Sequence, residues 1–226
     1  MFSFFSPQVL HFGRGQSQQT AALAKSFGTN VLLVHGSRPA RAEWLLQSGR
    51  DAGLTMKTLS CAAEPSLPDV ELALKQIAGF SPDVVIGLGG GSVLDFAKAL
   101  AALIGCAGAP RDYLEVVGLG RPLDVAPIPL IALPTTAGTG AEVTKNAVVL
   151  VPEFGIKVSL RDPRMVPQIA IVDPDHRIAN LLAKERGDPV APVVVGGQVK
   201  QRAVVVLQRE VYPRMGQCNS REGFGD

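Results

Sequence analysis

The apolar residues of the first 174 positions form short continuous runs. Between these runs lie longer segments in which apolar residues recur with the period of a helix. The runs at residues 31–34, 83–88, 128–133 and 169–172 are each followed within two residues by glycine, proline or aspartate. Continuous apolar runs of this length are typical of strands buried on both faces of a parallel sheet.

Between these runs, residues 41–50, 69–80 and 93–104 have the apolar spacing of amphipathic helices. Gly49 or Gly53 is expected to close the first helix, and Asp69 is expected to cap the second. Residues 54–59 could add a strand. Residues 105–127 are rich in glycine and proline and predict a loop. A hairpin is predicted for residues 147–151 and 156–160, with its turn at 152–155. This alternation predicts an α/β fold, a Rossmann-like domain on a largely parallel sheet.

The pattern changes after Pro174. Two valine-rich runs, at 193–195 and 203–207, are separated by polar residues, and residues 214–226 contain little that could be buried. We therefore expect a dinucleotide-binding domain at residues 1–174 and a tail at 175–226 that is partly disordered.

Composition narrows the class of protein. The chain has 226 residues, of which 46% are hydrophobic, and its 22 basic residues nearly balance its 20 acidic ones. A chain of this length and apolar content can form a hydrophobic core. Because its basic residues form no cluster, no nucleic-acid partner is expected. No signal peptide and no long apolar stretch are evident, so no membrane partner is expected either. Three scattered cysteines, interpreted as incidental thiols, favour the reducing cytoplasm.

The strongest local signal is the run Gly87-Leu88-Gly89-Gly90-Gly91-Ser92, which follows an apolar strand and precedes a helix. Glycines allow a diphosphate to approach the backbone, and the N-terminus of the helix directs free N–H groups toward it. Ser92 could cap the helix or bind a phosphate oxygen. The run lacks the lysine of a P-loop and the closing glycine of a nucleophile elbow. Taken alone, it could be only a tight strand-to-helix turn.

The second signal is the sequence PTTAGTGAEVT at residues 134–144, directly after the strand at 128–133. In open α/β sheets, ligands bind beyond the carboxyl ends of the strands. Hydroxyl groups at that edge suit a phosphate or a ribose, although a solvated turn would have the same composition.

Together these segments resemble the iron-containing (group III) alcohol dehydrogenases, which share a fold with dehydroquinate synthase. GGGSVLDFAK at 89–98 is similar to the family's GGGSxxDxAK, and residues 134–144 to its PTTAGTGSEVT, with Ala141 in the usual serine position. Phe12-Gly13-Arg14-Gly15 and the segment from Lys157 to Pro174 follow the family pattern in order. The resemblance covers about residues 5–174, and it implies hydride transfer between NAD(P) and a small alcohol or aldehyde substrate.

The resemblance also implies a cofactor site. Gly89, Gly90, Gly91 and Ser92 would hold the pyrophosphate, and Asp95 would lie near the nicotinamide. Phosphate, ribose or adenine would contact the hydroxyl-bearing residues Thr135, Thr136 and Thr139. Asn146 and Lys157 would complete the pocket.

One departure bears on the choice of cofactor. The family often places an acidic residue after the first strand, where it binds the adenosine ribose. Here that strand ends in His35-Gly36-Ser37-Arg38. Ser37 and Arg38 could bind a 2′-phosphate, so we expect NADP(H) to be accepted at least as well as NAD(H). A solvent-facing Arg38 is the alternative.

The other departure concerns the metal. The family continues beyond Pro174 with a helical domain whose aspartate and histidines bind Fe(II) or Zn(II), and none of that pattern follows here. The chain's histidines, His11, His35 and His176, have no metal-ligand spacing. We therefore expect the family's C-terminal helical domain to be missing, with no catalytic or metal residues in this chain and weak or absent turnover. The alternative is a non-catalytic nucleotide-binding module or an inactive truncated fragment, and a homodimer could cover the exposed apolar surface.

Overall fold

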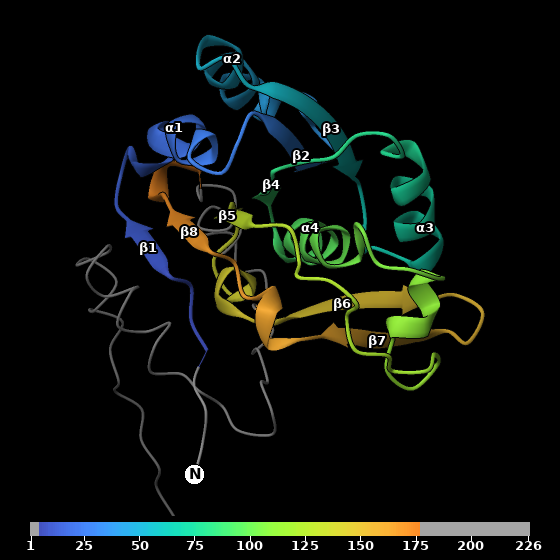
Figure 1. Cartoon of the computed structure of the whole chain (residues 1–226). Coiled ribbons are helices and arrows are strands. Elements are labelled where there is room, and N and C mark those ends of the chain that lie inside the picture. The colour runs from blue at the N-terminus through green and yellow to red at the C-terminus, as the bar shows by residue number, and fades with distance from the viewer. Residues whose placement is uncertain (1–4, 177–226) are drawn as a thin grey trace, which may run out of the picture. The chain divides into compact units, whose positions relative to one another are not determined.

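The computed structural model describes residues 5–176 and contains a six-stranded sheet in which every paired neighbour is parallel (Figure 1). Its strands are β1 (Val9–Phe12), β2 (Asn30–Gly36), β3 (Thr55–Cys61), β4 (Val84–Gly89), β5 (Leu130–Pro134) and β8 (Ile169–Val172). They lie in the order β1-β8-β5-β4-β2-β3. The predicted α/β class with a largely parallel sheet is confirmed.

Helices cover both faces of this sheet because alternate residues of each strand point to opposite sides. Val31 and Leu33 of β2 belong to the cluster that includes α1 (Thr20–Lys25) and α2 (Glu43–Asp51). Leu32 and Val34 belong to the cluster of α3 (Leu67–Gln76) and α4 (Gly91–Leu103). The strand is therefore buried on both faces, which explains its uninterrupted apolar run.

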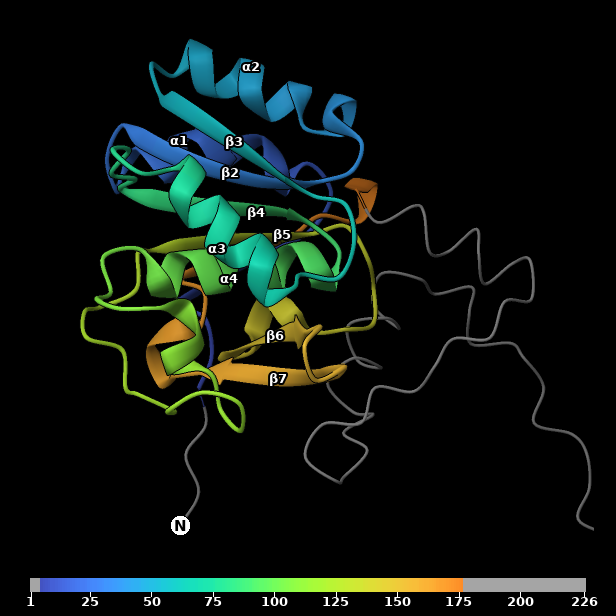
Figure 2. The same ribbon diagram turned by 90° about the vertical axis from the view of Figure 1, so that its right-hand side faces the viewer.

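Helix α4 lies between the main sheet and a separate antiparallel hairpin, formed by β6 (Asn146–Val151) and β7 (Ile156–Arg161) (Figure 2). Ten of its thirteen residues are buried, because both of its sides are covered. A helix enclosed in this way has to be apolar nearly all round, so the burial of Lys98 within it is unusual. The predicted hairpin and its turn at 152–155 are confirmed.

Two local predictions were wrong or incomplete. Ser66, not Asp69, is the N-cap of α3; the two form a capping box in which the Asp69 carboxylate accepts from the Ser66 backbone at 2.9 Å. Gly49 does not close α2 but lies inside it, where a Cβ would fall 2.1 Å from the Met56 sulfur. The helix ends just before Gly53, whose φ of +73° suits a residue without a Cβ.

The first and last strands of the described domain pair with each other, Val9 opposite Ile169. Just after β8, the buried Asp173 carboxylate accepts hydrogen bonds from the Ser17 backbone at 3.0 Å and the Ser17 hydroxyl at 2.7 Å. Asp173 Oδ1 also accepts from the Asp175 backbone at 3.0 Å. This carboxylate therefore fixes the turn that follows the Phe12-Gly13-Arg14-Gly15 segment.

Short 3-10 helices complete the described chain: η1 (Gln16–Gln19), η2 (Pro39–Arg41), η3 (Pro110–Tyr113), η4 (Ala141–Val143), η5 (Pro163–Met165) and η6 (Pro174–His176). The predicted loop at 105–127 is thus a loop apart from η3. The tail predicted at 175–226 lies outside the described residues except for its first two. Within residues 5–176 no helix is both long and apolar enough to cross a membrane.

Candidate functional site

Three loops with distinctive sequences meet at one edge of the sheet, because the strands before them are adjacent and parallel. His35 of β2 is opposite Leu88 of β4, and Gly89 of β4 is opposite Pro134 of β5. The segments where these strands end carry residues 36–38, 90–92 and 135–140. The structure therefore brings together the segments that the sequence analysis had singled out separately.

The N-terminus of α4 lies at this edge with no side chain capping it. Gly90 is the N-cap in an extended conformation, and no acidic residue stands in the first turn. Ser92 is exposed as the second helical residue, so it does not cap the helix. The first N–H groups of a helix have no partner within it and carry partial positive charge, which makes this position suited to an anion.

The packing of the protein itself leaves little space for a side chain at the glycines before α4. A Cβ on Gly89 would fall 2.5 Å from the Val93 side chain, and a Cβ on Gly90 would fall 3.2 Å from Thr136 Cγ2. The sequence had suggested that these glycines leave room for a ligand. The structure shows that neighbouring side chains already use part of that room: Val93 of the first motif lies against Gly89, and Thr136 of the second motif lies against Gly90.

The loop after β5 packs closely along the start of α4. The Thr135 backbone donates to the Gly89 carbonyl at 2.9 Å, and Thr139 Oγ1 accepts from the Ala141 backbone at 3.4 Å. Ala141 is 6% exposed and packs with Leu94, which explains why a small apolar residue is accommodated in the family's serine position. The hydroxyl-bearing loop is thereby held beside the helix N-terminus.

Further along α4, Asp95 lies within reach of a buried cation. Burial raises the pKa of Asp95, while Lys98 and a backbone hydrogen bond from Val148 act in the opposite direction. Lys98 Nζ is 3.8 Å from Asp95 Oδ1 and donates to the Asn146 carbonyl at 3.1 Å. Asp95 and Asn146 are therefore linked through Lys98, a residue of the first motif to which the sequence analysis gave no role.

Lys157, on β7, lies at the exposed surface and forms an ion pair with Glu64 at 2.8 Å. Glu64 follows β3, and the adjacent Pro65 carbonyl accepts from the Leu150 backbone at 2.9 Å, so the hairpin is attached to the loop after β3. Sequence reasoning had not selected Glu64, since nothing in the pattern indicated that β3 and β7 approach each other.

The segment after β2 also reaches the start of α4. A Cβ on Gly36 would lie 3.9 Å from Val93 Cγ2, in the first turn of the helix. Ser37 and Arg38 are exposed. The structure thus places Gly36 beside the helix start and leaves the two polar residues accessible.

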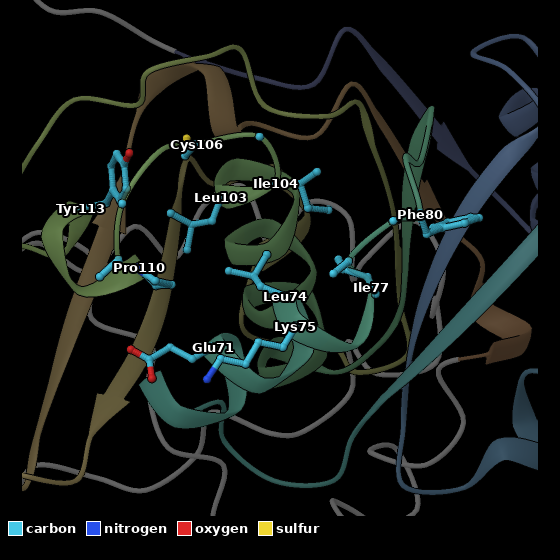
Figure 3. A pocket seen from close by; sticks show the side chains of 15 residues that line it. Glu71, Leu74, Lys75, Ile77, Phe80, Leu103, Ile104, Cys106, Pro110 and Tyr113 are labelled. Carbon is cyan, nitrogen blue, oxygen red and sulfur yellow. The ribbon is translucent and has the colours of Figure 1, made fainter.

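A cavity of about 640 Å³ lies elsewhere, between the ends of α3 and α4 and the following loop (Figure 3). Its lining includes Leu103, Ile104 and Tyr113. Because α4 is about 20 Å long, Leu103 and Ile104 lie at the opposite end of the helix from Gly91. The cavity is therefore not part of the edge where the three loops meet.

Residues 5–176 contain no group of three or more histidine, cysteine, aspartate or glutamate side chains that could hold a metal ion. A catalytic metal needs at least three such ligands in typical enzyme sites. The described residues thus do not fit a resident metal.

Comparison with known proteins gives a consistent result. The profile of the family described as iron-containing alcohol dehydrogenase matches residues 7–174. The NAD-dependent methanol dehydrogenase of Bacillus methanolicus is 29% identical over 182 residues, which are 77% of this chain and 46% of that protein.

Two solved structures agree in fold. An iron-containing alcohol dehydrogenase from Thermotoga maritima is 28% identical with a TM-score of 0.70, over 79% of this chain and 49% of that one. A sulfoacetaldehyde reductase from Bifidobacterium kashiwanohense, solved in complex with NAD+, is 26% identical with a TM-score of 0.68, over 79% and 48% of the two chains. The chain spans about half the length of the relatives it matches.

Proposed function

The chain belongs to the iron-containing alcohol dehydrogenase family, and from this premise we propose that residues 5–174 form a nicotinamide dinucleotide-binding domain. The activity it would serve is hydride transfer between the nicotinamide and a small alcohol or aldehyde. Relatives described as NAD-dependent or solved with NAD+ support the cofactor class.

The observation that carries the proposal is the uncapped N-terminus of α4 at the carboxyl edge of the sheet. Its backbone N–H groups, those of Gly91 and Ser92 first, would bind the negatively charged diphosphate. Thr135, Thr136 and Thr139 would supply hydroxyls to phosphate or ribose from the adjoining loop. The anion would thereby meet donors from two segments.

The remaining positions would serve the other end of the dinucleotide. Asp95 lies further along α4, and Asn146 is the first residue of β6. The exposed ammonium of Lys157 lies on β7. When bound, nicotinamide supplies the carbon that accepts or gives up a hydride. These side chains would orient that ring and its ribose.

The segment after β2 favours acceptance of NADP(H) at least as well as NAD(H). No carboxylate follows this strand at positions 36–38, so a 2′-phosphate would meet no repulsion there, and the exposed Ser37 and Arg38 could donate to it. Calorimetric titration of the wild-type chain with NAD+ and NADP+ tests this. Binding of NAD+ that is much tighter than binding of NADP+ would contradict it, and Arg38→Ala should weaken NADP+ selectively.

A second candidate function is dinucleotide binding without turnover. It is favoured by the lack of a metal-ligand group among residues 5–176, since family-type chemistry uses a metal to polarise the alcohol oxygen. Elemental analysis and an alcohol oxidation assay distinguish the two: stoichiometric iron or zinc with turnover supports the dehydrogenase, and metal-free protein that binds dinucleotide supports the binding module. Failure to bind either dinucleotide defeats both.

A further inference from the structure

We propose that Lys98 is a positioning residue for the dinucleotide: from inside the domain it ties residues 139–146 to α4, so that the hydroxyl-bearing loop stays beside the helix N-terminus. The inference rests on the proposed cofactor site and assigns to it a residue that makes no contact with the ligand. Lys98 is 1% exposed and lies among the apolar residues of α4.

Lys98 holds the segment leading into β6 at two points near the C-terminal end of that segment. Its ammonium donates to Thr144 Oγ1 at 2.9 Å and to the Asn146 carbonyl at 3.1 Å. Asp95, one turn earlier on the same helix, is 3.8 Å away and supplies a partly buried negative charge. A buried ammonium needs such partners, and here two of the three belong to the segment after β5.

A chain of hydrogen bonds continues from Lys98 toward the N-terminus of α4. Thr144 Oγ1 accepts from Lys98 and donates to the Ala141 carbonyl at 3.4 Å. The Ala141 backbone donates in turn to Thr139 Oγ1 at 3.4 Å. Thr139 is the residue whose side chain occupies the space above Gly91. The ammonium is thus connected to the loop residue nearest the proposed diphosphate position.

Burial of a charge at this position is energetically unfavourable. Desolvation lowers the pKa of Lys98 to about 8, with Asp95 and Glu142 acting in the opposite direction. An apolar side chain would fill the same space without that penalty. The ammonium offers what an apolar side chain cannot, namely directed hydrogen bonds to a hydroxyl and a carbonyl on a different segment.

The test compares dinucleotide affinity and loop order in the full chain. Thr144→Val removes the accepting oxygen and keeps the shape, Thr144→Ser keeps the oxygen, and Lys98→Met removes the ammonium. Lys75→Met, at an exposed position of α3, is the matched control. Calorimetry with NAD+ and NADP+ gives the dissociation constants, and amide hydrogen exchange reports on residues 136–146.

We expect Thr144→Val and Lys98→Met to weaken binding of the dinucleotide about tenfold, the effect of one lost charge-assisted hydrogen bond. Exchange in residues 136–146 should quicken in both variants, while Thr144→Ser and Lys75→Met should behave as wild type. Wild-type affinity and exchange in a folded Thr144→Val chain would overturn the role of Lys98, even if Lys98→Met fails to fold. If the wild-type chain binds no dinucleotide, the proposed function fails first and this role with it.

Discussion

Thr139 packs directly onto Gly91, so that a Cβ at position 91 would stand 2.9 Å from Thr139 Cγ2 and 3.3 Å from its Oγ1. The glycine that starts α4 and the threonine of the loop after β5 are therefore complementary in shape. A side chain larger than glycine at position 91 therefore requires Thr139 to move.

The first prediction follows from this contact. Gly91→Ala should destabilise the domain by about 1 kcal/mol through overpacking and should weaken dinucleotide binding, because Thr139 must shift. Adding Thr139→Ser removes the methyl group that makes the closest contact and should recover at least half of both losses. Urea unfolding and calorimetry measure the two effects. A Gly91→Ala chain with unchanged stability and affinity would contradict this prediction, because it would show that Thr139 can shift without an effect on folding or binding.

The second prediction separates helix stability from anion binding at the same position. Ser92→Asp places a carboxylate in the first turn of α4, which should stabilise the helix by about 0.5 kcal/mol. The same charge should repel the diphosphate and weaken dinucleotide binding about tenfold or more. Ser92→Asn, with a similar shape and no charge, should retain binding. Equal affinities for the Asp and Asn variants would place the diphosphate elsewhere.

The third prediction concerns the carboxylate that fixes the turn after β1. Burial alone would raise the pKa of Asp173, but hydrogen bonds from Ser17 and Asp175 outweigh it and lower that pKa below 3.8. Asp173→Asn should therefore cost about 2 kcal/mol at neutral pH, as expected for hydrogen bonds to a charged group. In the wild-type chain this stabilisation is present above pH 3.8, the pKa of an unperturbed aspartate. It is lost as the pH falls through the lower pKa that Asp173 has in the folded chain.

The control for that experiment is Asp175→Asn. Asp175 is exposed and pairs with the exposed Arg14, so its carboxylate should contribute little to stability. Unfolding midpoints in urea at about pH 7 and about pH 3 compare the two variants. Similar losses in both would show that the buried hydrogen bonds of Asp173 are not the source of the effect.

The fourth prediction is a pH dependence caused by Lys98. Its folded pKa of about 8 is below the ordinary 10.5, so between these values the unfolded chain binds a proton that the folded chain has released. The unfolding free energy should rise with pH across this window, by up to roughly 3 kcal/mol. Cys61 acts oppositely above pH 9, since burial raises its pKa to about 11. The measurement is therefore the difference between wild type and Lys98→Met, and no difference in slope would contradict the assignment.

The architecture could be predicted from the sequence because it depends on long, regular patterns. The apolar runs that became β2, β4, β5 and β8 are buried on both faces, and uninterrupted apolar runs of strand length between turn residues are typical of such strands. By contrast, β1 is four residues long at the edge of the sheet, and Val9 and Leu10 are exposed. A short, half-exposed strand leaves no periodic signal, so it was not predicted.

The candidate site was predictable as a pair of motifs but not as an arrangement. The sequence placed glycines and hydroxyls each directly after an apolar strand, yet nothing in it indicated that Thr136 and Thr139 occupy the space beside Gly90 and Gly91. Lys98 could not be recognised either, because a lysine in a helix is ordinarily expected at the surface. The segment leading into β6 and the start of the hairpin accept hydrogen bonds from Lys98 and help to make that position part of the interior.

The pairing of β1 with β8 has a consequence for synthesis of the protein. The first strand leaves the ribosome long before its only described neighbour, β8, which is the last strand among residues 5–176. Until then its backbone groups remain without their sheet partner, and contacts so distant in sequence slow folding. We infer that the nascent chain completes this domain only after β8 has been synthesised, and that β1 stays unpaired until then.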